Sequence, residues 1–314
     1  MLKLVRVLIR ILLKRSDKAF LPEVDAYVSY FNKKDDFRAY DSSLLEEDYD
    51  IKDFDVLWEF KGFGGDCSIN HIIVHEYASL STGLLPRFKN FLKSKFNPKP
   101  DLRVFLNENV KNGFNFNDEI EFCYRDMGID ESFLLYSKNL NKEYDFVYVG
   151  AVSKNRGIDK LLENFTRKNL GKICLIGNVD DELYKKYKHN KDFIFTGKVK
   201  YNEVPKIASK AVYGINYVPD KYPYNLQTST KLLEYLALGL KVITTDYWWI
   251  RNFENKYNCS FYKVREKDFA ISRDKLERYN FSTGSFDPKD FLWDRIINKS
   301  GVEEKLFKLF RKSA

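Results

Sequence analysis

Three hydroxyl side chains stand together at a predicted helix start in the second half of the chain. In the loop after Tyr217, two prolines delay helix formation, and Thr228, Ser229 and Thr230 follow at the start of an apolar-periodic run. The free N–H groups and the positive dipole end of a helix start bind anions. We therefore expect this helix start to hold a diphosphate, with the hydroxyls as additional donors.

Two charged side chains extend this polar line along the predicted helix. Thr228, Lys231 and Glu234 are spaced by three residues and share one face, while the leucines between them can pack on a sheet. A carboxylate only accepts hydrogen bonds, so Glu234 can bridge the two vicinal hydroxyls of a ribose. A surface ion pair between Lys231 and Glu234 would explain the same spacing equally well.

A second cationic loop follows an earlier apolar run. The segment GAVSKNRGID places Lys154 and Arg156 just after the predicted strand at 144–150. Either side chain could neutralise the same diphosphate, and the guanidinium fork suits phosphate oxygens. An exposed basic loop is the alternative in a chain this rich in lysine.

The elements that must position these residues alternate between strand and helix. Short β-branched or aromatic runs at 144–150, 172–177, 193–197, 212–218 and 241–245 are separated by helical stretches, which predicts a parallel sheet covered on both faces. Ligands of such sheets bind at the carboxyl ends of the strands. Gly150, Gly177 and Gly197 lie at those ends, where they could bring backbone close to a ligand or simply make tight turns.

The first part of the chain reads as another strand-rich lobe. We predict an N-terminal lobe over residues 1–138, a second lobe over 139–272, and a helical tail over 273–314 that packs back on the N-terminal lobe. In the first lobe His75 and Glu76 end an apolar run. His75 could contact a ligand or relay a proton, or could be a buried structural histidine. Glu76 is the rival if the reaction needs a general base.

Other polar residues of the first lobe follow predicted strands. Lys61 and Gly62 belong to the loop KGFGGD, and Glu108 follows the run LRVFLN. Their position alone makes them candidates to line a cleft of the first lobe.

The first residues of the chain alternate cations with apolar residues. Four cations recur every three or four residues, namely Lys3, Arg6, Arg10 and Lys14. This predicts a basic amphipathic helix that can lie on an anionic membrane surface. The alternative is a first helix docked on the protein's own core. A signal peptide is disfavoured, because the cations interrupt the apolar run.

Composition narrows the class of protein further. The net charge of +8 favours anionic partners without choosing among them. The four cysteines form no CxxC pair and only three histidines are present, so we expect no metal, no cofactor and no disulfide framework. The aromatic residues lie mostly in apolar strand runs rather than interleaved with the cations, which disfavours a nucleic-acid partner. We expect a cytoplasmic protein, either free or peripheral on the cytoplasmic face of the inner membrane.

Several motifs taken together resemble those of the GT-B-fold glycosyltransferases, in particular the retaining family-4-like bacterial enzymes. YVGAVSKNRGIDKLLE, KICLIG, FIFTGKV and KLLEYLALGLKVITTD occur in the family's order. The resemblance implies an α/β fold of two Rossmann-like lobes whose parallel sheets face a cleft, with the acceptor bound by the first lobe, where Lys61, Gly62 and Glu108 are the acceptor-side candidates. It implies that Arg156 binds phosphate, that Glu234 binds ribose, and that the nucleobase rests near Val199.

The same resemblance implies a function and two departures. It implies metal-independent transfer of a sugar from a nucleotide sugar to a saccharide or lipid-linked saccharide, in surface polysaccharide or glycolipid assembly. Leu226 replaces the family's second glutamate, and Ala151 replaces a frequent arginine. A sugar-nucleotide epimerase, a phosphorylase or a non-catalytic sugar-binding protein would be alternatives on the same fold.

Overall fold

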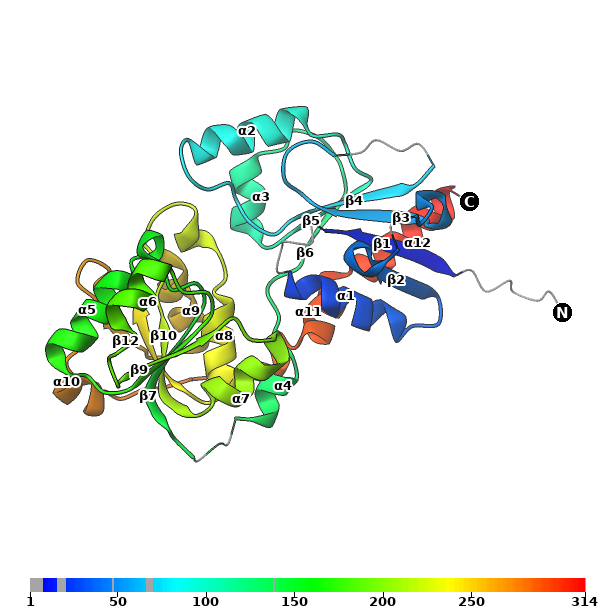
Figure 1. Ribbon diagram of the computed structural model, residues 1–314. Helices are drawn as coiled ribbons and strands as arrows, with labels where there is room; N and C mark the ends of the chain where they lie inside the picture. Colours follow the sequence, from blue (N-terminus) through cyan, green and yellow to red (C-terminus); the bar gives the residue numbers. More distant parts are fainter. Residues whose placement is uncertain are drawn as a thin grey trace. The chain divides into compact units, whose positions relative to one another are not determined.

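The computed structural model describes residues 8–15, 21–46, 48–65, 70–137, 139 and 141–313 (Figure 1). The chain divides into two compact units. The first comprises the residues up to Gly128 together with those from Trp293 onward, and the second comprises Ile129–Leu292.

The first unit is built on a six-stranded parallel sheet. Its strands are β1 (Ile9–Lys14), β2 (Phe37–Asp41), β3 (Val56–Phe60), β4 (Ile72–Tyr77), β5 (Leu102–Phe105) and β6 (Phe122–Tyr124). They lie in the order β2-β1-β3-β4-β5-β6, and every neighbouring pair is parallel. The strand order reverses between β1 and β3, so the topology opens a crevice at their carboxyl ends.

The prediction of an amphipathic helix at the amino terminus is wrong for residues 8–15, the part of this segment that the structure describes. Residues 9–14 form strand β1 inside the first sheet, and Ile9, Ile11, Leu12 and Leu13 are buried. A strand covered on both faces reads as a continuous apolar run, and here that run is interrupted only by the exposed Arg10. Residues 1–7, which carry the other cations of the predicted helix, lie outside the described residues.

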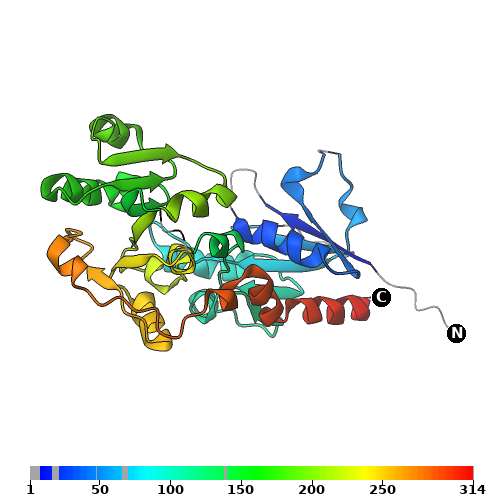
Figure 2. The same ribbon diagram turned by 90° about the horizontal axis from the view of Figure 1, so that it is seen from below.

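Helices cover both faces of the first sheet (Figure 1). They are α1 (Pro22–Asn32), α2 (Pro86–Phe96), α3 (Glu108–Phe114), α11 (Trp293–Ser300) and α12 (Val302–Ser313), with the short 3-10 turns η1 (Ser42–Leu44) and η2 (Ile51–Asp53). The two C-terminal helices, red in Figures 1 and 2, lie beside the blue elements of the first unit. Trp293, Ile297, Val302 and Leu306 share one apolar core with α1 and the sheet.

The second unit has its own six-stranded parallel sheet. Its strands are β7 (Tyr144–Val149), β8 (Ile173–Ile176), β9 (Phe193–Gly197), β10 (Ala211–Asn216), β11 (Lys241–Thr245) and β12 (Tyr262–Val264). Their order is β12-β11-β10-β7-β8-β9, with all pairs parallel. The order reverses between β7 and β10, as in dinucleotide-binding domains. The predicted α/β class with two parallel sheets is confirmed.

The second unit includes two segments beyond the predicted borders. Its helices are α4 (Ser132–Leu135), α5 (Ile158–Lys168), α6 (Asp181–Tyr187), α7 (Val204–Ala208), α8 (Thr230–Ala237), α9 (Trp248–Tyr257) and α10 (Arg273–Glu277), with the 3-10 turns η3 (Lys154–Arg156), η4 (Tyr201–Glu203), η5 (Tyr224–Leu226) and η6 (Pro288–Phe291). Ile129 bridges to Leu292, and Phe133 packs on Tyr201 with 5.6 Å between ring centroids. These contacts place the borders at 128/129 and 292/293, where we had expected 138 and 272.

Within the described residues, no helix is both long enough and apolar enough to span a bilayer.

Candidate functional site

The strand reversal between β7 and β10 brings two loops to one edge of the second sheet. Three glycines define this edge. The Gly150 amide donates to the Ile176 carbonyl at 2.8 Å, and the Gly177 amide donates to the Gly197 carbonyl at 2.9 Å. A Cβ on Gly177 would lie 2.3 Å from the Gly150 carbonyl oxygen. These glycines therefore allow the loops at the strand ends to lie against one another.

The start of α8 is fixed by a buried hydrogen-bond network. Ser229 is the N-cap residue, and its hydroxyl accepts from the Leu232 amide at 3.4 Å. The same hydroxyl donates to Asn216 at the end of β10, at 2.7 Å, and Asn216 in turn donates to Thr244 and Tyr247. The expected role of Ser229 as a phosphate donor is therefore corrected, because its proton is used by Asn216. Thr228 is buried beside it, and Thr230 begins the helix.

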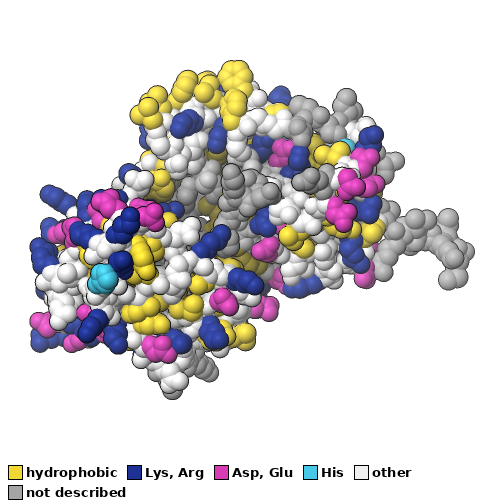
Figure 3. Space-filling model, in the orientation of Figure 1, with side chains coloured by type: hydrophobic (Ala, Val, Ile, Leu, Met, Phe, Trp, Pro, Cys, Tyr) yellow, Lys and Arg dark blue, Asp and Glu magenta, His cyan; other side chains and the backbone are white. Residues whose placement is uncertain are grey.

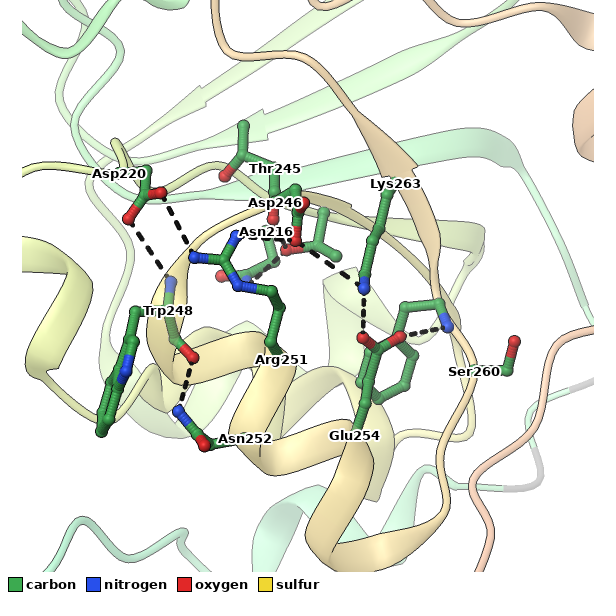
Figure 4. A network of polar contacts seen from close by, with 12 residues as sticks. Asn216, Asp220, Thr245, Asp246, Trp248, Arg251, Asn252, Glu254, Ser260 and Lys263 are labelled. Carbon is green, nitrogen blue, oxygen red and sulfur yellow. Dashed lines mark hydrogen bonds and ion pairs between the residues drawn. The ribbon is translucent and has the colours of Figure 1, made fainter.

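The loop between β10 and α8 is held from the other side by ion pairs around α9 (Figure 4). Arg251 contacts Asp220 of this loop at 3.5 Å and Asp246, which follows β11, at 3.2 Å. Lys263 joins Asp246 to Glu254 of α9, at 3.7 and 2.7 Å. Asp220 and Asp246, which follow neighbouring strands, thus share Arg251. This shared ion pair holds the loop that leads from β10 into α8.

Arg156 and Lys231 place two positive charges at this edge. The exposed Arg156 lies near Tyr148 on β7, where its positive charge opposes the rise that burial causes in the pKa of Tyr148, and the Lys231 ammonium lies 5.4 Å from the centre of the same ring. Burial and the positive charge of Arg156 lower the pKa of Lys231 to about 8. Two cations that destabilise one another in this way favour the binding of an anion between them.

Glu234 lies one helical turn beyond Lys231. Its side chain is buried, and Oε1 accepts a 2.7 Å hydrogen bond from the hydroxyl of Tyr201 in η4. Burial raises the pKa of Glu234 to about 7, although the hydrogen bond from Tyr201 and the charge of Lys231 oppose that shift. Tyr201 connects this carboxylate to the half-buried Val199 two residues earlier. The predicted contacts for ribose and nucleobase thus lie in neighbouring segments.

Lys154 does not join this group. Its ammonium forms an exposed ion pair with Glu182 of α6, and its backbone amide donates to Asp180 at 3.0 Å. Of the two cations in the loop after β7, the structure places Arg156 at the edge and Lys154 away from it.

In the first unit, His75 lies in a buried cluster near the strand reversal. Its Nε2 is 3.5 Å from Oε2 of Glu59, to which Lys61 donates at 2.8 Å and whose other oxygen is 3.6 Å from Lys14. Burial, with the charges of Lys61 and Arg103, lowers the pKa of His75 to about 3. The imidazole is therefore neutral at ordinary pH, and no described residue hydrogen-bonds either ring nitrogen.

The structure argues against Glu76 as a general base. Glu76 points to the opposite face of the sheet from His75, as adjacent strand residues must, and its side chain is fully buried. Its carboxylate pairs with Arg125 and accepts from the indole of Trp58 at 2.8 Å. A carboxylate held in this way has no access to a substrate, and its role is to neutralise Arg125 inside the core.

The other acceptor-side candidates occupy separate places in the first unit. The Gly62 carbonyl accepts from the Asn97 side chain at 3.2 Å, so this loop is attached to the end of α2. Glu108 is the exposed first residue of α3, at the carboxyl end of β5. Within the described ranges, no group of three His, Cys, Asp or Glu side chains could hold a metal ion.

Three residues of these clusters were not anticipated from the sequence. They are Tyr148, Tyr201 and Glu59. Tyr148 and Glu59 lie within strands, where an aromatic or acidic residue usually reflects packing. Tyr201 stands in a polar segment four residues after Gly197, and only its contact with Glu234 gives it a role.

The second unit matches a known family by sequence. Residues 143–270 match the family described as "Glycosyl transferases group 1". No curated protein matches this chain.

Solved structures show the same fold at low sequence identity. AviGT4, a glycosyltransferase involved in avilamycin A biosynthesis, is 12% identical with a TM-score of 0.61, over 95% of this chain and 97% of that one. Sucrose-phosphate synthase from Thermosynechococcus elongatus is 15% identical with a TM-score of 0.52, over 83% and 74%. UDP-GlcNAc 2-epimerase from Methanocaldococcus jannaschii is 13% identical with a TM-score of 0.50, over 93% and 98%.

The family match covers the strands, the cationic loop and helix α8 that were described above, and the fold neighbours extend over both units. Residues 143–270 thus form a glycosyl transferases group 1 domain within a GT-B-type fold, and the chain is a nucleotide-sugar-dependent glycosyltransferase, as the sequence motifs predicted.

Proposed function

We propose that this enzyme transfers a sugar from a nucleoside-diphosphate sugar to a hydroxyl of a saccharide or lipid-linked saccharide, in the assembly of a bacterial surface polysaccharide or glycolipid. The observation that carries the proposal is the grouping of Arg156, Lys231 and Glu234 at the strand reversal of the second sheet. Two cations beside one buried carboxylate match the charges of a diphosphate joined to a ribose. The epimerase neighbour was solved with UDP-GlcNAc and UDP, so a UDP sugar is the first donor to test.

In the proposed reaction the departing nucleoside diphosphate gains negative charge as the glycosidic bond breaks. Arg156, Lys231 and the amide groups at the start of α8 would stabilise that charge, and preorganised electrostatics of this kind is usually the largest part of catalysis. Glu234 would hold the ribose and Val199 the nucleobase. No metal is needed in this scheme, because side-chain cations neutralise the phosphates.

We further propose that the reaction retains the anomeric configuration. An inverting transfer requires a general base on the acceptor side. Glu76 is engaged by Arg125, and His75 is a weak base with a pKa near 3. This supports retention, in which the leaving phosphate itself can take the acceptor proton. The cluster of His75, Glu59 and Lys61 would then orient the acceptor hydroxyl.

The donor assignment can be tested by calorimetry and thermal shift with UDP-, GDP-, CMP- and dTDP-sugars. We expect one nucleotide class to bind, and Glu234→Ala to weaken it about tenfold or more, because two ribose hydroxyls lose a charged acceptor. Glu182→Ala is the matched control, since it removes an exposed carboxylate that pairs with Lys154. Unchanged affinity in Glu234→Ala would show that the ribose assignment is wrong.

Donor affinity should also depend on pH in two opposite ways. As pH rises through about 7, Glu234 ionises and becomes a better acceptor for ribose, so affinity increases. As pH rises further through about 8, Lys231 loses its proton and affinity falls. Calorimetry with an intact nucleotide sugar from pH 6 to 9 should give a maximum between these values. Glu234→Gln should remove the rise, and Lys231→Met should remove the fall.

A sugar-nucleotide epimerase would share the fold and the donor group. The two activities differ in their products, because an epimerase converts the nucleotide sugar without any acceptor. Release of nucleoside diphosphate only when an acceptor saccharide is present would support the transferase, whereas a new nucleotide sugar formed without acceptor would support the epimerase.

A further inference from the structure

Helix α2 of the first unit turns its apolar side chains away from the protein. Phe88, Phe91 and Phe96 are each more than half exposed, and Leu84, just before the helix, is 82% exposed. The fully buried residue of the helix is instead the polar Asn90. At about 100° per residue, Phe88, Phe91 and Leu92 share one arc on the side opposite Asn90. The apolar face of α2 therefore points to solvent and its polar face points to the protein, the opposite of a helix packed on a core.

Polar contacts hold α2 in this orientation. The Asn90 side chain accepts from the Ser81 amide at 2.9 Å. At the end of the helix, the Asn97 amide donates to the Lys93 carbonyl, and the Asn97 side chain bonds both Gly62 and Gly64. Because these anchors are on the inner side, the phenylalanines remain exposed. Figure 3 shows hydrophobic side chains gathered over α2 at the top of the view. A contiguous exposed patch of this kind marks an interaction surface.

The charge of this segment is uniformly positive. Residues 77–100 contain no Asp or Glu, and their cations are Arg87, Lys89, Lys93, Lys95 and Lys99. Partial burial and the charge of Lys89 lower the pKa of Lys93, so these two lysines repel one another. A negatively charged partner would relieve that repulsion. Aromatic side chains interleaved with lysines are typical of helices that lie at the surface of an anionic bilayer.

We propose that α2, with the preceding Leu84 and Leu85, is the surface by which this protein lies on an anionic lipid bilayer. The phenylalanines and leucines would enter the region between headgroups and acyl chains, while the lysines contact the lipid phosphates. A second copy of the chain fits less well, because a symmetric contact through this patch would bring lysines against lysines. In the proposed function, a lipid-linked acceptor would reach the enzyme at this bilayer surface. Binding of the surface to lipid can nevertheless be tested without any substrate.

The test is flotation of the full chain with vesicles of phosphatidylcholine alone and of phosphatidylcholine with phosphatidylglycerol. We expect binding to the mixed vesicles only, weakened by raising the salt, since screening shortens electrostatic range to about 3 Å at 1 M. Phe88→Ser with Phe91→Ser should reduce binding at least about tenfold through lost apolar burial. Lys89→Glu with Lys95→Glu should weaken binding about 25-fold or more, because each reversal of charge near the surface weakens binding about fivefold or more.

Matched controls lie elsewhere on the chain. Leu135→Ser removes a leucine that is 80% exposed on α4, and Lys185→Glu reverses an exposed lysine on α6. Both should bind vesicles as the wild type does. Retained nucleotide-sugar binding in the α2 variants would show that they are folded.

Three results would overturn the proposal. The first is unchanged vesicle binding by the double phenylalanine variant, and the second is equal binding to neutral vesicles at every salt concentration. The third is a dimer by light scattering that the phenylalanine variant converts to a monomer while no form binds vesicles, since the patch would then join two copies. Failure of vesicle binding with intact nucleotide-sugar binding would leave the proposed function standing.

Discussion

Arg156→Ala and Lys231→Met should each lower kcat/KM for the nucleotide sugar about 100-fold. Both side chains direct positive charge to the edge where β7 and β10 end. Among the described residues, no carboxylate forms a direct ion pair with either cation, so both charges are available to a phosphate. Removing one donor that stabilises developing negative charge costs a factor of about 100 to 1,000 in enzymes. Steady-state kinetics with the donor identified by the thermal-shift screen would measure the effect.

A nucleoside without phosphates separates this role from a general loss of structure. At a pH well above 7, where Glu234 is ionised with or without the charge of Lys231, both variants should bind the nucleoside as the wild type does, because Glu234 and Val199 are unchanged. Lys154→Ala is the matched control from the same loop. Since its ammonium pairs with Glu182 in solvent, we expect a change of less than about threefold. The assignment of Arg156 is wrong if Lys154→Ala impairs turnover and Arg156→Ala does not.

The second sheet could be predicted from the sequence because its strands are short apolar runs separated by clear helical stretches. The start of the chain could not be predicted in the same way. Arg10 and Lys14 have helical spacing, yet residues 9–14 form an inner strand, since a strand buried on both faces carries no alternation that would reveal it. Deleting residues 1–15 would therefore remove a strand of the sheet, and could not test membrane binding alone.

The site was predictable to the level of the loop but not always to the residue. Lys154 and Arg156 are the first and last residues of the 3-10 turn η3, and only the ion pair of Lys154 with Glu182 and the nearness of Arg156 to Tyr148 separate their roles. Tyr201 was missed because its partner Glu234 is 33 residues away in the sequence. Adjacent residues of a strand point to opposite faces of the sheet, so the sequence already placed His75 and Glu76 on different faces. It did not show which of the two faces packs against the core.

Arg125→Met should destabilise the protein by about 3–5 kcal/mol. Arg125 is completely buried between two acids, with Glu76 in direct contact and Glu23 at 3.7 Å, and its Nε donates to the hydroxyl of Tyr27 at 3.2 Å. Removing the cation leaves two carboxylates in the core without their charge partner, and breaking a buried pair from one side has this magnitude. Urea denaturation would measure the free energy of unfolding. Lys186→Met, which breaks an exposed pair with Glu163, should cost less than about 1 kcal/mol.

The same buried pair decides whether Glu76 has a catalytic role. Adding Glu76→Gln to Arg125→Met should recover part of the lost stability, because one of the two unpaired carboxylates becomes neutral while the amide oxygen can still accept from Trp58. Glu76→Gln alone should be less stable than the wild type yet turn over at a similar rate below its unfolding transition. A fully folded Glu76→Gln enzyme with turnover reduced about 100-fold or more would restore Glu76 as the general base, because that is the range lost when acid–base catalysis is removed.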